Sequence, residues 1–180
     1  MKKRKIAKMT GLLLAAVLLT GCFAGCSGGG DQNELIIGIT YFAPMNYMED
    51  GELTGFETEF ATAVCEKLGM TPKFQEIKWE SKETELNGNA IDCIWNGMTI
   101  DDDRKESMQI SVPYMRNKQV AVVLKENAEK YKDLTNLEGV TVVAEAKSAG
   151  ETVATTDETF QDASYTPVDA QSKALLEVKS

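Results

Sequence analysis

Two kinds of hydrophobic pattern alternate along the chain. Short apolar runs bounded by glycine, proline, asparagine or aspartate are typical of strands, and apolar residues spaced three or four apart are typical of helices. The runs predict strands at 35–39, 73–79, 91–95, 119–124, 137–144 and 165–168. The spaced patterns predict helices at 57–68, 81–86, 101–108, from 148 onward and at 169–179. Strands that alternate with helices in this way predict an α/β fold whose mostly parallel sheet is covered on both faces.

Turn and cap residues support several of these elements. Asp50-Gly51 predicts a hairpin, Gly69 is placed to end a helix, and Asp169 is placed to cap the last one. The strand-then-helix pattern restarts after about residue 125, which predicts two lobes of similar type. In such sheets ligands bind at the carboxyl ends of the strands, so residues that directly follow the apolar runs are the candidates for a site.

The first 30 residues differ from the rest of the chain. Five basic residues lie within the first eight, and the uncharged, mostly apolar run 11–21 follows them. This is typical of a signal peptide, here 1–21, since a transmembrane helix needs about 20 apolar residues. Leu-Thr-Gly-Cys22 resembles a bacterial lipobox, which implies cleavage before Cys22 and lipid attachment to it. Cys26 is a weaker second candidate, and a plain signal peptide with a chance cysteine is the alternative. Residues 22–34 then form a flexible tether.

Composition narrows the classes of function. Without residues 1–21 the chain keeps 14 basic against 28 acidic residues, a net charge of −14 that is wrong for nucleic acid or an anionic membrane surface. The absence of histidine excludes Ser-His-Asp and Cys-His nucleophiles and histidine-ligated metals. Cys65 and Cys93 remain beyond the tether. An exported protein permits a disulfide, but their apolar surroundings favour two buried free thiols. We therefore expect no metal site and no cofactor.

Arg104 is the most informative candidate for binding. It lies in the first turn of the predicted helix 101–108, where the helix dipole disfavours a cation. A guanidinium holds a carboxylate through two hydrogen bonds, and the N–H groups at a helix start favour anions. The alternative is an ion pair of Arg104 with Asp101 or Asp103 on a solvated surface.

The loop before this helix offers further groups for the same anion. Its residues are Asn96, Gly97, Met98 and Thr99. Gly97 lets the backbone approach a ligand closely, and Thr99 supplies a hydroxyl. Together with Arg104 they predict a site for one small carboxylate.

Aromatic residues stand at the ends of predicted strands. Phe42 follows the first strand, Trp79 ends another, and Trp95 precedes Asn96. Such residues sandwich an apolar ligand stem or support a cation, and they also occur as rim packing, which is the commoner arrangement.

Three segments of the chain carry a resemblance to a known family. They are GFETEFATAVCEKL at residues 55–68, IDCIWNGMTIDDDR at 91–104 and DLTNLEGVTVVAEAKSAGE at 133–151. The first is similar to the signature of solute-binding protein family 3, the polar amino acid receptors of ABC importers. The second resembles another segment of that family, and the third resembles the entry to its second lobe. The likeness runs from about Leu35 to the last residue.

The resemblance implies a two-lobed periplasmic-binding-protein-like fold of type II. Lobe 1 would span 35–118, a hinge strand 119–125, and a partial lobe 2 126–180. Arg104 would bind the ligand α-carboxylate with Thr99 and the Gly97 backbone, and Ser148 and Ala149 would add N–H groups and a hydroxyl. Phe42 and Trp79 would line the pocket.

Three departures from the family pattern matter. The loop before Ala43-Pro44 is one residue shorter than the commonest form in the family. Lys147 stands where the family often has glycine. The family also continues beyond the position of Ser180 into a strand with an aspartate for the ligand ammonium, so we expect a fragment whose second lobe is incomplete. The 180-residue chain by itself is then not expected to bind an amino acid tightly.

The function implied is an extracytoplasmic, monomeric receptor that captures a small amino acid for the permease of an ABC importer. Its lipid would hold it at the outer face of the cytoplasmic membrane, and it would not be an enzyme. The alternatives are a sensor module of a signalling receptor, or an enzyme on the same fold, such as a dehydratase or peptidoglycan lyase. Glu145 and Glu151 are the acid-base candidates for an enzyme by position, although neither lies in a catalytic motif.

Overall fold

The structure, a computed structural model, describes residues 33–179. The predicted signal peptide, the lipid attachment at Cys22 and nearly all of the tether lie outside the described residues.

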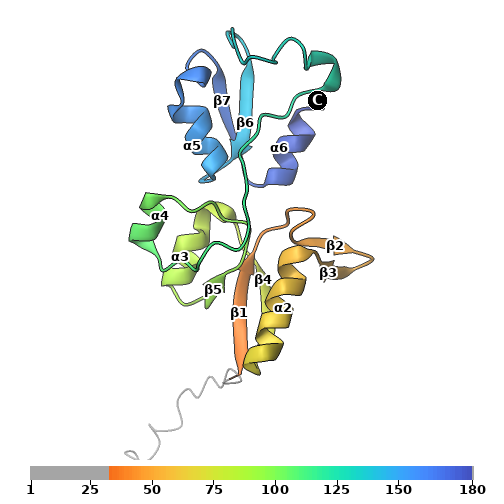
Figure 1. The fold of residues 1–180 in the computed structure, drawn as a ribbon, viewed down its shortest axis with the longest axis vertical. Coiled ribbons are helices and arrows are strands. Elements are labelled where there is room, and N and C mark those ends of the chain that lie inside the picture. Colours follow the sequence, from red (N-terminus) through yellow and green to blue (C-terminus); the bar gives the residue numbers. More distant parts are fainter. Residues whose placement is uncertain (1–32, 180) are drawn as a thin grey trace, which may run out of the picture. The chain divides into compact units, whose positions relative to one another are not determined.

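A three-stranded parallel sheet forms the first part of the fold. Its order is β4 (Thr71–Glu76), β1 (Glu34–Ile39) and β5 (Cys93–Ile94). The apolar run of β1 supplies Ile37 and Ile39, which are 0% and 2% exposed. Helix α2 (Phe56–Leu68) runs alongside this sheet and contributes buried Ala61 and Cys65 to the same core (Figure 1). Burial of this apolar surface is the main stabilising term for the sheet.

Local turn chemistry explains the elements that connect β1 to α2. The predicted Asp50-Gly51 turn is confirmed: both residues have positive φ, and they join β2 (Tyr47–Glu49) to β3 (Glu52–Thr54) in an antiparallel hairpin. Gly69 ends α2 in the left-handed conformation with φ 68°, as predicted.

Two predicted strands of this part, β5 and β4, are shorter than their apolar runs, and β5 covers only Cys93–Ile94 of the run 91–95. Strand β4 ends at Glu76, and Trp79 begins the 3₁₀ turn η1 (Trp79–Ser81) that leads into α3 (Lys82–Asn87). The prediction of a strand up to Trp79 is therefore wrong in its last residues. The helix predicted at 101–108 is confirmed as α4 (Asp102–Ser107).

The predicted hinge strand at 119–125 is not formed. Residues 109–124 carry neither helix nor strand, and Val120 and Val122 are 74% and 51% exposed. Within the described residues no strand forms a backbone ladder with this run. Strand formation depends on a partner ladder and cross-strand packing, so a β-branched apolar run alone does not make a strand. The 3₁₀ turn η2 (Lys125–Asn127) follows.

A second parallel sheet begins after this segment. It pairs β6 (Thr141–Glu145) with β7 (Ser164–Val168), and α5 (Ala149–Thr156) and α6 (Gln171–Glu177) pack against β6 from either side (Figure 1). The turn η3 (Glu158–Phe160) connects α5 to β7. The predicted helix start at Ser148 is confirmed, and so is the strand near 165–168.

The predicted cap at Asp169 is wrong. Helix α6 has Ala170 as its N-cap, and no side chain caps it. The Asp169 carboxylate instead pairs with Lys173, with 2.6 Å between Oδ1 and Nζ. An ion pair one turn along the helix thus takes the place of the capping bond.

Both cysteines in the described residues are free thiols, as the sequence favoured. Burial raises the pKa of both, that of Cys93 to about 11, so they stay protonated at neutral pH. No described helix has the length and apolar character needed to cross a membrane. Residues 33–179 also contain no cluster of three acidic or cysteine side chains suited to a metal ion.

Candidate functional site

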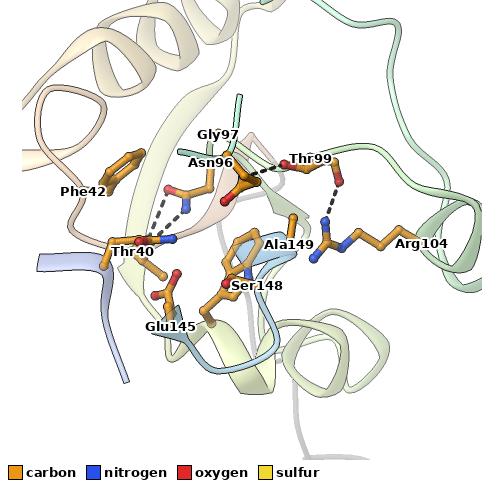
Figure 2. A pocket seen from close by; sticks show the side chains of 12 residues that line it. Thr40, Phe42, Asn96, Gly97, Thr99, Arg104, Glu145, Ser148 and Ala149 are labelled. Carbon is orange, nitrogen blue, oxygen red and sulfur yellow. Dashed lines mark hydrogen bonds between the residues drawn. The ribbon is translucent and has the colours of Figure 1, made fainter. Parts of the chain in front are cut away.

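A cavity of about 40 Å³ lies where the carboxyl ends of strands from both sheets meet (Figure 2). It is lined by Thr40, Phe42, Trp79, Asn96, Gly97, Thr99, Arg104, Gln119, Glu145, Ser148, Ala149 and Gln171. Eight of the nine residues predicted for a ligand site are among them, and Met98 is the exception. A cavity of this size admits a few water molecules, since one needs about 10–15 Å³, but it does not admit an amino acid.

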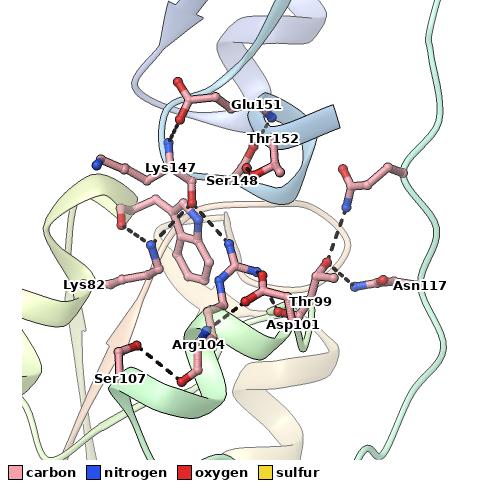
Figure 3. A network of polar contacts seen from close by, with 12 residues as sticks. Lys82, Thr99, Asp101, Arg104, Ser107, Asn117, Lys147, Ser148, Glu151 and Thr152 are labelled. Atoms are coloured by element: carbon pink, nitrogen blue, oxygen red, sulfur yellow. Dashed lines mark hydrogen bonds and ion pairs between the residues drawn. The ribbon is translucent and has the colours of Figure 1, made fainter. Parts of the chain in front are cut away.

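Arg104 is buried at one side of this cavity, with only 7% of its surface exposed. Its guanidinium donates to the Thr99 carbonyl at 2.6 Å through Nη1 and to the Lys147 carbonyl at 3.2 Å through Nη2 (Figure 3). These bonds connect the loop before α4 with the loop after β6, and they fix the plane of the guanidinium.

The ion pair considered for Arg104 also exists. Asp101 Oδ2 lies 3.0 Å from Arg104 Nη1, and Asp101 Oδ1 accepts the Arg104 backbone N–H at 2.9 Å as the N-cap of α4. The Arg104 side chain is only 9% exposed and the Asp101 side chain is 44% exposed, so the arginine is buried while its carboxylate partner faces solvent. Because Asp101 caps α4, the first turn of this helix already holds a carboxylate of the protein.

The loop 96–99 is held by its own polar side chains. Asn96 donates to the Thr40 hydroxyl at 2.8 Å and accepts from Asn46 at 2.9 Å, which joins the ends of β1 and β5. The Thr99 hydroxyl accepts from Asn117 and Gln119 at 3.3 and 3.4 Å. Asn96 thus shapes the loop, and the Thr99 hydroxyl keeps its proton available for donation.

The start of α5 provides N–H groups at the same cavity. Ser148 is its N-cap, with a side-chain oxygen that accepts from Glu151 N at 3.2 Å. The first N–H groups of a helix have no acceptor within it, so those of Ala149 and Gly150, which precede the capped N–H of Glu151, are donors for an anion. Glu151 also accepts from Lys147 N at 2.7 Å and from the Tyr165 hydroxyl at 2.9 Å, which fixes the loop before α5.

Lys147 adopts the left-handed conformation with φ 60°, which explains why glycine suits this position. Its carbonyl accepts from Arg104 and, at 3.4 Å, from Lys82 Nζ. Lys82 is 3% exposed, and burial and then the Arg104 charge lower its pKa.

Replacing Lys147 by glycine is expected to keep or raise the free energy of unfolding, by up to about 1 kcal/mol. The left-handed penalty of about 1–2 kcal/mol disappears and outweighs the entropy cost of glycine, about 0.5–1 kcal/mol. Urea unfolding of the complete gene product measures the change, with Lys147→Val as the matched variant that should destabilise. A glycine variant less stable than the valine variant would contradict the strain assigned to Lys147.

The aromatic residues divide into two groups. Phe42 and Trp79 line the cavity, and Trp79 is 5% exposed with an indole N–H that has no acceptor among the described residues. Trp95 instead packs edge-on against Phe60, with ring centroids 5.4 Å apart. Trp95 therefore belongs to the core around α2, whereas Trp79 lines the cavity.

Four cavity residues were not predicted as binding residues: Thr40, Gln119, Glu145 and Gln171. Thr40 and Glu145 directly follow predicted strands, and ligands bind at the carboxyl ends of strands in such sheets, so their positions agree with a site. The sequence suggests Glu145 only as an acid-base group. Gln119 and Gln171 carried no local signal, because only tertiary contacts bring their segments to the cavity.

The chain has an α/β fold in which a buried arginine and the start of a helix lie at the carboxyl ends of the strands. Comparison with known proteins places this fold in the type II periplasmic-binding-protein-like class of binding proteins. The chain belongs to the bacterial extracellular solute-binding proteins, family 3, whose pattern residues 35–178 match. This confirms the family and fold class inferred from the sequence.

Individual proteins show the same relationship. The chain is 35% identical over 144 residues to the probable amino-acid-binding protein YxeM of Bacillus subtilis, covering 78% of this chain and 54% of that protein. It is also similar to an ABC uptake transporter substrate binding protein from Streptococcus pneumoniae with bound histidine. That structure has a TM-score of 0.71 and 32% identity over 82% of this chain and 62% of the other.

A third similar structure is the ancestral amino acid-binding protein AncCDT-1, a precursor of cyclohexadienyl dehydratase. Its TM-score is 0.77 with 28% identity, over 82% of this chain and 66% of the other. The chain thus spans between about half and two thirds of the length of these relatives.

Proposed function

We propose that this chain is the ligand-capturing part of an extracytoplasmic receptor that binds one small amino acid and delivers it to the permease of an ABC importer. Membership of the family and the names of its relatives support this function. The observation that carries the proposal is the buried Arg104, which faces a cavity shared with the start of α5. Arginine and unpaired helix N–H groups are the donors that hold a carboxylate.

The mechanism is capture by closure around the ligand. The cavity is too small for an amino acid in the described state, so the parts that line it separate before a ligand enters. The ligand carboxylate then replaces the Lys147 carbonyl as a partner of Arg104 Nη2. Closure excludes water and strengthens these charged contacts in a lower dielectric.

We propose the same division of the chain that the sequence predicts. Lobe 1 is 35–118 and carries Phe42, Trp79, the loop 96–99 and Arg104, and lobe 2 is the part from 126 with Ser148 and Ala149. Residues 119–125 connect the two lobes and act as the hinge. We propose that the receptor works as a monomer.

A screen of free amino acids by thermal shift tests the function. A ligand at 100 times its Kd stabilises the protein by about 2.7 kcal/mol, which a melting curve resolves. The complete gene product should respond to at least one amino acid and to none of the corresponding amides that lack the carboxylate. If no amino acid shifts the melting temperature, the proposed function is wrong.

Catalysis is the second candidate function, favoured by the similarity to the dehydratase precursor. We propose that this chain is not an enzyme, because the Glu151 carboxylate is engaged in holding the loop before α5. Mass spectrometry of the bound amino acid after prolonged incubation should recover it unchanged. A dehydrated or deaminated product would support the enzyme instead.

Gly97 provides a test that separates binding from folding. A Cβ at this position would meet only Glu57 and Met45 atoms at 3.9 Å, which is ordinary contact, so the fold does not require glycine. Gly97→Ala is expected to change the free energy of unfolding by less than about 0.5 kcal/mol. Calorimetry should show at least about tenfold weaker ligand binding, because the new methyl group blocks the close backbone approach. Unchanged affinity would remove Gly97 from the site.

Cys22 is proposed as the lipid attachment site that holds the receptor at the outer face of the cytoplasmic membrane. Cys22→Ser is expected to move the protein from the membrane fraction to the soluble fraction, because the acyl chains that anchor it are lost. Fractionation and immunoblotting give the readout, with Cys26→Ser as the matched control. Release by Cys26→Ser alone would assign the lipid to Cys26.

A further inference from the structure

Glu145 is a buried carboxylate in the cavity wall to which the proposed function assigns no role. It is the last residue of β6 and is 4% exposed. Figure 2 shows its carboxylate among the cavity side chains and well separated from the Arg104 guanidinium. A carboxylate at this depth loses much of its hydration, which is costly unless another group compensates it.

The groups around Glu145 compensate it only in part. The backbone N–H of Gln171 hydrogen-bonds the carboxylate, the Lys82 charge favours its ionised form, and the Asp169 charge opposes it. Burial outweighs these effects and raises the pKa of Glu145 to about 7. Within residues 33–179 no lysine or arginine forms an ion pair with Glu145.

Lys82 is the nearest candidate for a partner, and it is held elsewhere. Its Nζ donates to the carbonyls of Trp79 and Lys147 at 3.3 and 3.4 Å and lies 4.7 Å from the centre of the Trp79 ring. Glu145 therefore keeps acceptor positions free toward the cavity, since one backbone N–H uses only one of its lone pairs.

The cavity thus has one basic and one acidic lining residue, Arg104 and Glu145. A complementary ligand carries an anion at one end and a cation at the other. The α-ammonium of an amino acid is one carbon from its carboxylate, so its counter-ion lies close to Arg104. The separation of Glu145 from Arg104 in Figure 2 suits a group that the ligand side chain carries further away.

We propose that Glu145 determines ligand specificity by pairing with a cationic side chain, so that the receptor selects a basic amino acid. The proposal rests on the proposed function and names the substrate class of the same site. Phe42, which also lines the cavity, adds an aromatic face over which a guanidinium or ammonium stem packs favourably.

The experiment compares charged ligands with neutral analogues of the same shape. L-arginine is paired with L-citrulline, and L-lysine with L-norleucine, by calorimetry at pH 8 on the complete gene product. We expect one basic ligand to bind at least about 30-fold more tightly than its neutral analogue, as for a desolvated charge pair. Tighter binding of citrulline, norleucine or another neutral amino acid would overturn the inference and leave the proposed function intact. Absence of binding by any amino acid would overturn both.

Glu145→Gln keeps the shape of the side chain and removes its charge. It should weaken binding of the basic ligand at least about 30-fold and change binding of the neutral analogue by less than about threefold. Glu138→Gln, an exposed glutamate of the same part of the chain, is the matched control and should change neither. If Glu145→Gln weakens charged and neutral ligands equally, Glu145 contacts the ammonium or supports the fold, and the inference is wrong.

The pH dependence gives an independent readout, because arginine and lysine stay charged from pH 5.5 to 8. Pairing with a cation favours ionised Glu145, so binding releases a proton below about pH 7 and affinity rises as the pH increases. The other charged groups near Glu145 are Lys82 and Asp169, and both remain in the variant. Calorimetry in buffers of different ionisation enthalpy should detect proton release at pH 6 in the wild type and not in Glu145→Gln. Equal proton release in both proteins would assign it to another group and overturn the inference.

Discussion

Replacing Arg104 by alanine is expected to weaken amino acid binding at least about 30-fold, which corresponds to about 2 kcal/mol or more. The guanidinium is buried and held by Thr99, Asp101 and Lys147, so it meets a ligand carboxylate at low entropic cost. Alanine removes this donor and leaves the carboxylate of the ligand desolvated without a partner. Calorimetry with the amino acid found by the thermal-shift screen measures the loss.

Two further variants make the Arg104 test specific. Arg104→Lys should also fail to bind tightly, because an ammonium lacks the planar fork that holds the Thr99 carbonyl and the ligand carboxylate at the same time. Lys105→Ala changes the neighbouring residue of α4, whose ammonium pairs with Asp102 at 2.8 Å on the surface, and should bind as the wild type does. Tight binding by Arg104→Ala would return Arg104 to a structural role in its ion pair with Asp101.

Replacing Asn46 by leucine is expected to lower the free energy of unfolding by about 2–4 kcal/mol. Asn46 is 0% exposed, donates to Asn96 at 2.9 Å and accepts from the Thr58 hydroxyl at 2.8 Å. Leucine removes both bonds in a buried position, where each lost bond costs about 1–3 kcal/mol, although the Thr58 hydroxyl keeps the Thr54 carbonyl at 3.2 Å and Asn96 keeps the Thr40 hydroxyl. Urea unfolding of the complete gene product gives the value.

A double-mutant cycle with Thr58→Val separates the lost hydrogen bonds from a simple packing error. The double variant should be more stable than the sum of the two single changes predicts, because each single change breaks the same bond between Thr58 and residue 46. Strict additivity would show that the cost arises from the volume of leucine and not from the polar network. The same network holds Asn96 beside Thr40, so the single variant should also weaken ligand binding.

The sequence brought together residues that line one cavity where several signals lay close together in the chain. Arg104, Gly97 and Thr99 lie within eight positions, and a strand end followed by a helix start brings them to one edge of the sheet. Met98 was included because it shares this loop, but an extended loop directs neighbouring side chains to different sides, and Met98 does not line the cavity. The sequence pattern does not indicate to which side of the loop the Met98 side chain points.

Glu145 shows what one sequence does not reveal. Its place at a strand end was visible, yet its importance comes from burial, from Gln171 and from the charges of Lys82 and Asp169, which lie up to 63 positions away in the sequence. Nothing in the sequence indicates that Lys82 is buried near the site, because a lysine in a polar stretch is normally exposed. Only the contact of the Lys147 carbonyl with both Lys82 and Arg104 makes it part of the site.

The sequence by itself determined the α/β class, the order of elements, the Asp50-Gly51 hairpin, the end of α2 at Gly69 and the position of Arg104. These features depend on side-chain periodicity and on backbone preferences within a few residues, so local sequence is sufficient for them. The tertiary structure decided that Val120 and its neighbours form no strand, that Trp79 begins a turn, and that Glu145 lies in the same cavity as Arg104. Strand pairing, burial and the charge around a side chain all depend on residues that are distant in sequence and close in space. Local sequence patterns do not indicate which distant residues come together.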